Sequence, residues 1–311
     1  MSRVCPPVSE IIEAMEQVFR AKASGLADLP PKLGLSLDNE AFIHAMPASV
    51  LSLGAVGVKW ISVFPRNAAM GMPQVCGLII LNDPSTGGPM AVLDAATITA
   101  ERTGAASALA ARFLARPSSE TVGVLGCGIQ ARSHLRALSA EFPLRLVRAY
   151  DVSEQAAQLL VANIRASSGI EAVIADAPET AVRDSDIIVT AAPISRAGRR
   201  TIEAEWLAEG SCAISVDYVS LWTAEALAGM DVTITDDLKQ LARARAEGYC
   251  KGLPEVDTEL CDLVAGNAAG RTSDQQRTMA LHLGIALEDV ILARLIVDRA
   301  VESDVGVWLP I

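Results

Sequence analysis

Aromatic residues, histidines and paired cysteines are all scarce in this sequence. Phenylalanine, tryptophan and tyrosine make up 4% of its 311 residues, and it has three histidines and six cysteines, with no Cys-x-x-Cys pair. Cysteines scattered in this way favour neither a zinc site nor a disulfide framework. We therefore expect no metal centre, and the scattered cysteines indicate a reducing compartment.

Basic runs and long apolar runs are missing as well. The chain has 26 Lys and Arg residues against 37 Asp and Glu residues, and its formal net charge of -11 argues against nucleic-acid binding. No apolar run approaches the roughly 18 to 20 residues of a membrane span, and the first residues lack the apolar core of a signal peptide. These absences predict a cytoplasmic protein with neither nucleic acid nor a membrane as partner.

The apolar residues that are present follow two different patterns along the chain. Residues 1–116 begin with a helical pattern from Ser9, continue as short strand-like pieces, and end in a helix that starts near Thr97 and stops before Pro117. Short strands separated by turn signals are typical of an antiparallel sheet. This first segment is therefore predicted to be an α+β unit.

Strands alternate with helices in residues 117–278, which predicts a parallel sheet covered on both faces. From residue 279 the chain returns to one long helical stretch, which we expect to pack back on the first segment. The predicted fold class is α/β, with a Rossmann-type doubly wound sheet in residues 117–278. A second, discontinuous α+β domain is formed by residues 1–116 and 279–311.

A nucleotide-binding fingerprint follows the first strand of the parallel region. The run from Gly126 to Ala131 matches the Gly-x-Gly-x-x-Gly/Ala pattern, and it joins the strand TVGVL to a helix. Gly126 would permit the tight turn, Gly128 the close approach of a pyrophosphate, and Ala131 close packing of helix on strand. Ile129 and Gln130 would lie at the helix N-terminus, where the phosphates bind. The alternative is a tight turn without a ligand.

Asp151 ends the next strand, where a carboxylate accepts hydrogen bonds from the adenosine ribose. A carboxylate repels the 2′-phosphate of NADP, so Asp151 indicates NAD. Arginines that lie close by in the sequence keep NADP open as an alternative.

Lys59 stands in the strand-like run GVKWISVF, whose apolar residues fall on both faces. Both faces are therefore expected to be covered. A buried ammonium is costly, so this lysine has either a nearby anion or a shifted pKa. The alternative is an edge strand from which the amine reaches water.

The chain resembles the ornithine cyclodeaminase/μ-crystallin family from Ile11 to Leu309. The matching motifs are PPKL, HAMPA, GVKWISVFPRN, GLIILNDPSTGGPMAVLD, TITAERTGAASALAARFLAR, VGVLGCGIQARSHLRAL, DIIVTAAP and GIALEDVILARL. Members include ornithine cyclodeaminases, alanine dehydrogenases and cyclic ketimine reductases. The resemblance implies that the discontinuous domain binds substrate and forms a homodimer.

The resemblance also implies roles for individual residues of the substrate pocket. Lys59 would polarise or protonate the substrate, and Asp217 would face its nitrogen. Arg102 would grip the α-carboxylate, with Lys32 as a second cationic contact. His44 would line the pocket.

Near the nicotinamide, the resemblance places Ala192 and Pro193. The implied activity is NAD(P)-dependent hydride transfer at Cα of a small amino acid or of its 2-imino or 2-keto counterpart. One alternative is a redox-neutral ornithine cyclodeaminase, which converts ornithine to proline and ammonia, and another is a μ-crystallin-like ligand-binding protein. The sequence after Asp217 departs from the family pattern, because it lacks the Pro-Gly-Lys-Thr-Glu-like run of ornithine cyclodeaminases.

Overall fold

The computed structural model describes residues 3–37 and 41–309. The chain forms two compact units, Met1–Arg102 with Ile285–Ile311, and Thr103–Gly284. These limits differ from the predicted boundaries near residues 116 and 279, because one helix runs through Arg102 and because a strand occupies residues 278–281. The assignment of substrate and cofactor domains stays a prediction.

The first unit contains a five-stranded antiparallel sheet in the order β1-β2-β3-β4-β5. Its elements are α1 (Val8–Ala23), β1 (Leu33–Ser36), β2 (Phe42–Val50), β3 (Ala55–Val63), β4 (Val75–Asn82), β5 (Pro89–Asp94) and α9 (Ala286–Glu302). The predicted antiparallel region is thus confirmed. The sequence pattern missed β1, whose run LGLS is only four residues long and contains glycine and serine, which are typical of turns.

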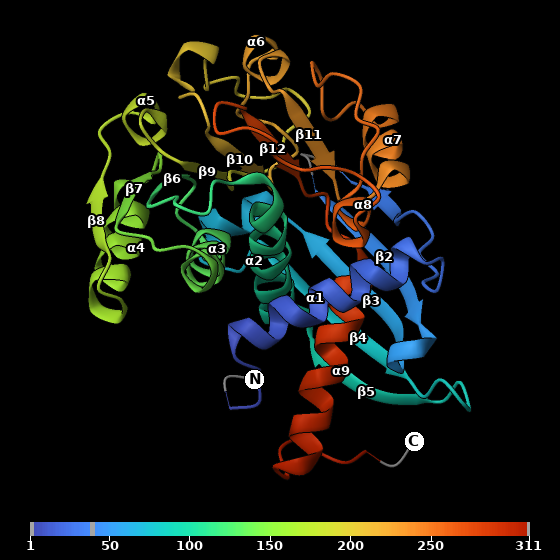
Figure 1. Ribbon diagram of the computed structural model, residues 1–311. Helices are drawn as coiled ribbons and strands as arrows, with labels where there is room; N and C mark the ends of the chain where they lie inside the picture. Colours follow the sequence, from blue (N-terminus) through green and yellow to red (C-terminus); the bar gives the residue numbers. More distant parts are fainter. Residues whose placement is uncertain (1–2, 38–40, 310–311) are drawn as a thin grey trace. The chain divides into compact units, whose positions relative to one another are not determined.

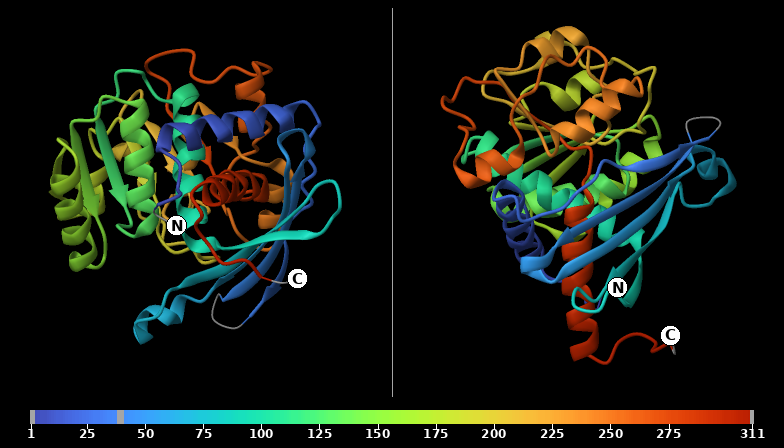
Figure 2. Two further views of the ribbon diagram at one scale, coloured as in Figure 1. Left: turned by 90° about the horizontal axis from the view of Figure 1, so that it is seen from below. Right: turned by 90° about the vertical axis from the view of Figure 1, so that its right-hand side faces the viewer.

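One face of this sheet packs against helices, and the other is open. The closing helix α9 contacts β2, β3 and β4, and α1 packs on α9 (Figure 2). Lys59 lies on the covered face with 1% of its surface exposed, whereas its neighbour Trp60 is 49% exposed on the other face. The prediction that both faces of β3 are covered is wrong for the single chain.

Two helices begin earlier than the sequence predicted. Helix α1 starts at Val8 behind Pro7, without a side-chain cap from Ser9. Helix α2 (Ala95–Leu114) starts two residues before Thr97, because the Asp94 carboxylate accepts from the amides of Ala96 and Thr97 at 3.0 and 3.4 Å. A carboxylate in this position satisfies amides that the first turn leaves unpaired.

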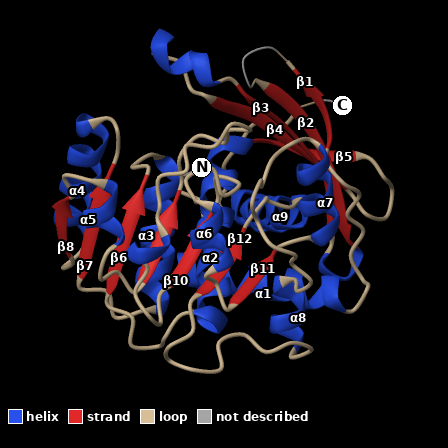
Figure 3. Ribbon diagram, turned by 90° about the horizontal axis from the view of Figure 1, so that it is seen from above, coloured by secondary structure: helices blue, strands red, loops and turns tan. Residues whose placement is uncertain are grey.

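The second unit is a seven-stranded parallel sheet in the order β11-β12-β10-β9-β6-β7-β8 (Figures 1 and 3). Its strands are β6 (Thr121–Leu125), β7 (Leu146–Tyr150), β8 (Glu171–Ile174), β9 (Ile187–Thr190), β10 (Cys212–Ser215), β11 (Val232–Thr235) and β12 (Thr278–Leu281). Its helices are α3 (Ile129–Glu141), α4 (Glu154–Ser167), α5 (Pro178–Val182), α6 (Ala224–Ala228), α7 (Leu238–Ala246) and α8 (Leu260–Ala265), in addition to the second part of α2. The predicted doubly wound α/β fold is confirmed.

Strand β12 corrects the reading of the closing segment. The run from Ala280 was predicted to be helical, but Thr278–Leu281 pairs in parallel with both β10 and β11. A short apolar run has no period that separates a buried strand from a buried helix, so its two strand neighbours decide. The helix proper begins at Ala286.

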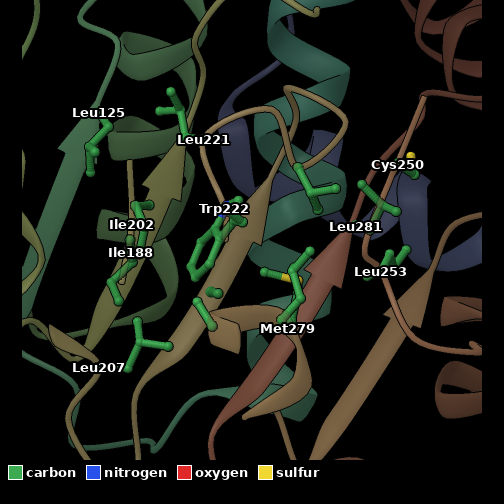
Figure 4. Packing of buried hydrophobic residues seen from close by; sticks show 14 of the residues in the cluster. Leu125, Ile188, Ile202, Leu207, Leu221, Trp222, Cys250, Leu253, Met279 and Leu281 are labelled. Carbon is green, nitrogen blue, oxygen red and sulfur yellow. The ribbon is translucent and has the colours of Figure 1, made fainter. Parts of the chain in front are cut away.

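Side chains on one side of the parallel sheet form an apolar cluster around the indole of Trp222 (Figure 4). Trp222 has no exposed surface, and Leu221, Met279 and Leu281 belong to the same cluster. This packing holds the loop that follows β10 at the carboxyl edge of the sheet. Across the described parts of the chain, no helix is both long enough and apolar enough to pass through a membrane.

Candidate functional site

The loop between β6 and α3 has the geometry of a dinucleotide fingerprint. Gly126 has a φ of 95°, and a Cβ there would lie 2.6 Å from the Ala191 carbonyl oxygen, so only glycine fits. A Cβ at Gly128 would meet nothing within 4 Å. Open space at Gly128, in front of the first amides of α3, lets an anion approach the backbone.

Asp151 is held rigidly at the end of β7. Its Oδ2 accepts from the Cys127 amide at 2.7 Å, and its Oδ1 accepts from the Ser153 amide at 2.8 Å. A pocket in this unit is lined by Gly126, Asp151, Ala192 and Pro193, together with other residues of the loops at this edge. Four of the predicted cofactor residues therefore surround one hollow, and its glycine loop and carboxylate suit the adenosine half of NAD. Ala192 and Pro193, which the resemblance places near the nicotinamide, line this hollow together with Asp151, and their predicted role stays a prediction.

The other fingerprint residues divide between surface and core. Ile129 is 52% exposed and Ala131 is fully buried against the strand. Gln130 has a buried Oε1 without a hydrogen-bond partner in the described chain. Burial raises the pKa of the Cys127 thiol to about 12, so this thiol is protonated at neutral pH.

Lys59 is paired with an acid on the closing helix of its own unit. Its Nζ lies 2.6 Å from Oδ2 of Asp289, and both side chains are buried. The pKa of Lys59 is lowered from 10.5 to about 8, chiefly by burial; Arg102 and Lys32 also lower it, and Asp289 raises it. The sequence predicted a nearby anion or a shifted pKa for Lys59, and both are found, with Asp289 as the anion.

Arg102 meets the same acid and its neighbour. The guanidinium donates from Nε to Asp289 Oδ1 at 3.0 Å and from Nη1 to Glu288 Oε2 at 2.5 Å. Asp289 thus bridges Lys59 and Arg102, which the sequence had placed in one pocket.

Sequence reasoning missed Glu288 and Asp289. Two adjacent acids at the start of an otherwise apolar helix are the signal that could have found them, since buried acids need cationic partners.

Lys32 and His44 lie in the same unit. Lys32 is 8% exposed and its charge acts on Lys59. His44 is on β2 beside the Phe42 ring, with the two ring centroids 4.4 Å apart. His44 pairs with Ile61 of β3, two residues from Lys59 on the same face of the sheet. These positions leave their predicted roles as predictions.

Asp217 follows β10 at the carboxyl edge of the parallel sheet, in the second unit. Its Oδ1 accepts from the hydroxyls of Thr190 at 2.9 Å and Ser215 at 2.7 Å. Its Oδ2 is buried and has no hydrogen-bond partner among the described residues. Burial raises the pKa of Asp217 to about 6, against these hydrogen bonds, which lower it.

The backbone after Asp217 is strained. Tyr218 and Val219 have φ angles of 56° and 54°, and Val219 is β-branched. Such a conformation costs of order 1 to 3 kcal/mol per residue and persists only where surrounding contacts enforce it. The strain lies where the sequence departs from the family pattern, beside the orphaned carboxylate oxygen.

Known proteins match this chain along nearly its whole length. An alanine dehydrogenase of Archaeoglobus fulgidus is 35% identical, with 96% of this chain and 92% of that protein covered. The solved structure of Thermococcus litoralis Δ1-pyrroline-2-carboxylate reductase with NADH and L-proline has a TM-score of 0.89 at 29% identity, covering 98% of this chain and 97% of the other. An archaeal alanine dehydrogenase dimer with bound NAD has a TM-score of 0.87 at 34% identity, covering 98% and 95%. The sequence profile of one family matches residues 5–304, and the chain belongs to this family, the ornithine cyclodeaminase/mu-crystallin family.

Proposed function

We propose that this protein is an NAD-dependent oxidoreductase that transfers a hydride at Cα of a small amino acid or its 2-imino or 2-keto counterpart. The observation that carries the proposal is the buried charge cluster of the first unit. Lys32, Lys59 and Arg102 supply three positive charges, and Glu288 and Asp289 supply two negative ones, all at 8% exposure or less. Lys59 and Arg102 meet at the shared Asp289 carboxylate, so a planar cationic fork and a group able to transfer a proton lie together in one buried cluster.

Arg102 is the proposed contact for that carboxylate. A planar guanidinium binds a carboxylate through two parallel hydrogen bonds. Glu288 and Asp289 would fix its orientation. An arginine held in this way loses little rotamer freedom when the substrate binds.

Lys59 is the proposed proton donor and acceptor. A lysine with a pKa of about 8 is charged in most molecules at neutral pH but loses its proton readily. In the deamination direction the neutral amine would take a proton from the substrate ammonium, and in reduction the ammonium would stabilise the imine or keto group. The positive charge of Arg102 and the negative charge of Asp289 tune this balance in opposite directions.

Asp217 is the proposed partner of the substrate nitrogen. Its buried Oδ2 is available as an acceptor for an ammonium or iminium N–H. A carboxylate with a pKa of about 6 is largely ionised at neutral pH, so it stabilises positive charge that develops on nitrogen.

The cofactor proposal rests on the second unit alone. Gly126 and Gly128 would hold the pyrophosphate against the start of α3, and Asp151 would bind the adenosine ribose. NAD, when bound, supplies the hydride acceptor. The rigid Asp151 carboxylate favours NAD over NADP, because it would lie against a 2′-phosphate.

An amino-acid panel tests the function. The protein is incubated with alanine, proline or ornithine and with either excess or catalytic NAD, and NADH is followed by absorbance while ammonia is assayed separately. NADH formed in proportion to product supports the proposal. Proline and ammonia formed from ornithine with catalytic NAD and no net NADH indicate the cyclodeaminase alternative. Tight NADH binding without turnover of any amino acid, imine or keto acid indicates a binding protein.

We also propose a homodimer that covers the open face of the five-stranded sheet. Trp60, Leu78 and Val92 are 49%, 50% and 56% exposed. By strand register they share one face, since Trp60 pairs with Leu78, and Val92 pairs with Ile80 two residues along. Exposed apolar side chains on a sheet face favour association. Sedimentation of the protein and of a Trp60→Glu variant tests this, with a monomeric parent counting against it.

A further inference from the structure

The Asp217 carboxylate stands at the end of a chain of hydrogen bonds that begins at a tryptophan. The indole Nε1 of Trp222 donates to Thr190 Oγ1 at 3.1 Å, and that hydroxyl donates to Asp217 Oδ1 at 2.9 Å. Trp222 has no exposed surface. Because the indole is a donor only, the Thr190 oxygen must act as acceptor toward it, which directs the Thr190 proton to the carboxylate.

A second chain reaches the same carboxylate oxygen. The Val219 amide donates to Ser215 Oγ at 3.0 Å, and Ser215 Oγ donates to Asp217 Oδ1 at 2.7 Å. Each hydroxyl thus accepts a hydrogen bond from a backbone or indole N–H and has one proton to donate. Both protons go to Oδ1, and Oδ2 is left as a buried oxygen without a hydrogen-bond partner in the described chain.

We propose that Trp222 is a positioning residue that acts through Thr190. The hydrogen bond from Thr190 occupies Oδ1 of Asp217, so that Oδ2 is left to accept from the substrate nitrogen. The inference rests on the proposed role of Asp217 and extends it to a residue outside the substrate's reach. Donor chains of this kind polarise each hydroxyl, so they stabilise the ionised carboxylate more than isolated hydroxyls do.

The location of Trp222 supports a role beyond filling space. It ends the strained turn at Tyr218 and Val219, and its amide donates to the Val219 carbonyl at 3.1 Å. The indole therefore anchors the turn from inside the apolar cluster of Figure 4 while its N–H points to the Thr190 hydroxyl. A phenylalanine would keep an aromatic ring in the cluster and lose only the donor and part of the volume.

The titration of Asp217 has to be separated from that of other groups near it. Thr190 and Ser215 do not titrate, and the Cys250 thiol, on which the Asp217 charge acts, has its pKa raised to about 12, chiefly by burial. Asp236 acts on the same thiol and is also buried. A carbon signal from the Asp217 carboxyl, identified by its loss in Asp217→Asn, separates the two aspartates.

The first test measures the Asp217 pKa by carboxyl carbon NMR in the parent protein, in Trp222→Phe and in Trp206→Phe. Trp206 packs on the same cluster and serves as the matched control. We expect Trp222→Phe to raise the Asp217 pKa by about half a pH unit or more, because the polarised donor is lost. The acidic limb of kcat/KM should move by the same amount, and Trp206→Phe should change neither.

The second test needs no substitution in the protein that is measured. In protein labelled with ¹⁵N-tryptophan, one of the four indole N–H signals, assigned to Trp222, should shift with the same pKa as Asp217. An indole signal that does not respond while Asp217 titrates overturns the proposal, as does an unchanged Asp217 pKa in folded Trp222→Phe. Both NMR readouts are independent of turnover, so a protein without dehydrogenase activity would refute the proposed function and leave this inference to its own result.

Discussion

Replacing Lys59 with methionine tests separately how much the buried charge destabilises the fold and how much the amine contributes to turnover. The unfolded chain carries this lysine with an ordinary pKa of 10.5, whereas the folded chain holds it at about 8. At 1.36 kcal/mol per pH unit, the protonated amine destabilises the fold by about 3 kcal/mol below pH 8. This penalty already includes the attraction of Asp289.

The sign of the pH dependence follows from the lowered pKa. Between pH 8 and 10.5 the unfolded chain binds a proton that the folded chain has released, so the stability of the parent rises with pH across this window. Methionine has no proton to bind and a similar length. Lys59→Met should therefore be as stable as the parent or up to about 3 kcal/mol more stable at pH 7, and the difference should shrink toward pH 10.5.

Urea unfolding followed by circular dichroism at pH 7 and pH 10 measures this difference. Other groups that titrate in this range are common to both proteins and cancel in the comparison. Lys239, an exposed lysine, provides the control variant Lys239→Met, which should change stability little at either pH. Turnover should fall about 10²-fold or more in Lys59→Met alone, because the proton donor is gone.

Two outcomes would refute the reasoning about Lys59. A Lys59→Met variant less stable than the parent by more than about 2 kcal/mol at pH 7 would mean that the pair with Asp289 outweighs desolvation. Turnover within about twofold of the parent, with the same pH profile, would remove Lys59 from the chemistry.

Three further substitutions test other parts of the molecule. Asp151→Ala should narrow the preference for NADH over NADPH in binding titrations, and equal affinities in the parent would contradict the proposed role of Asp151. Arg102→Lys keeps the charge but loses the planar fork, so kcat/KM for carboxylate substrates should fall at least tenfold while NADH affinity stays within about twofold. Full activity of this variant would argue against binding of the substrate carboxylate by Arg102. The Arg271 guanidinium donates to five backbone carbonyls, those of Leu114, Gly210, Ser211, Ser273 and Gln276. Arg271→Ala should therefore lower the free energy of unfolding by about 2 to 4 kcal/mol in urea titrations. A loss under about 1 kcal/mol would show that water replaces these bonds.

The local sequence pattern was enough to predict those features that depend on residues adjacent in the chain. The fingerprint from Gly126 to Ala131 could be predicted because the turn between β6 and α3 requires glycine at a φ of 95°. The same holds for the parallel sheet, whose strands are short apolar runs separated by helices. Lys59 could be singled out because a lysine in an apolar strand needs a partner.

Tertiary structure decided which partner each of these residues has. Asp289 is 230 residues from Lys59 in the sequence and meets it because α9 packs on β3. Strand β12 could not be told from a helix until β10 and β11 paired with it. The chain from Trp222 through Thr190 to Asp217 joins residues on separate elements, so no sequence spacing reveals it. Contacts between distant segments depend on the packing of whole elements, and a pattern read along the chain carries only the preferences of each element.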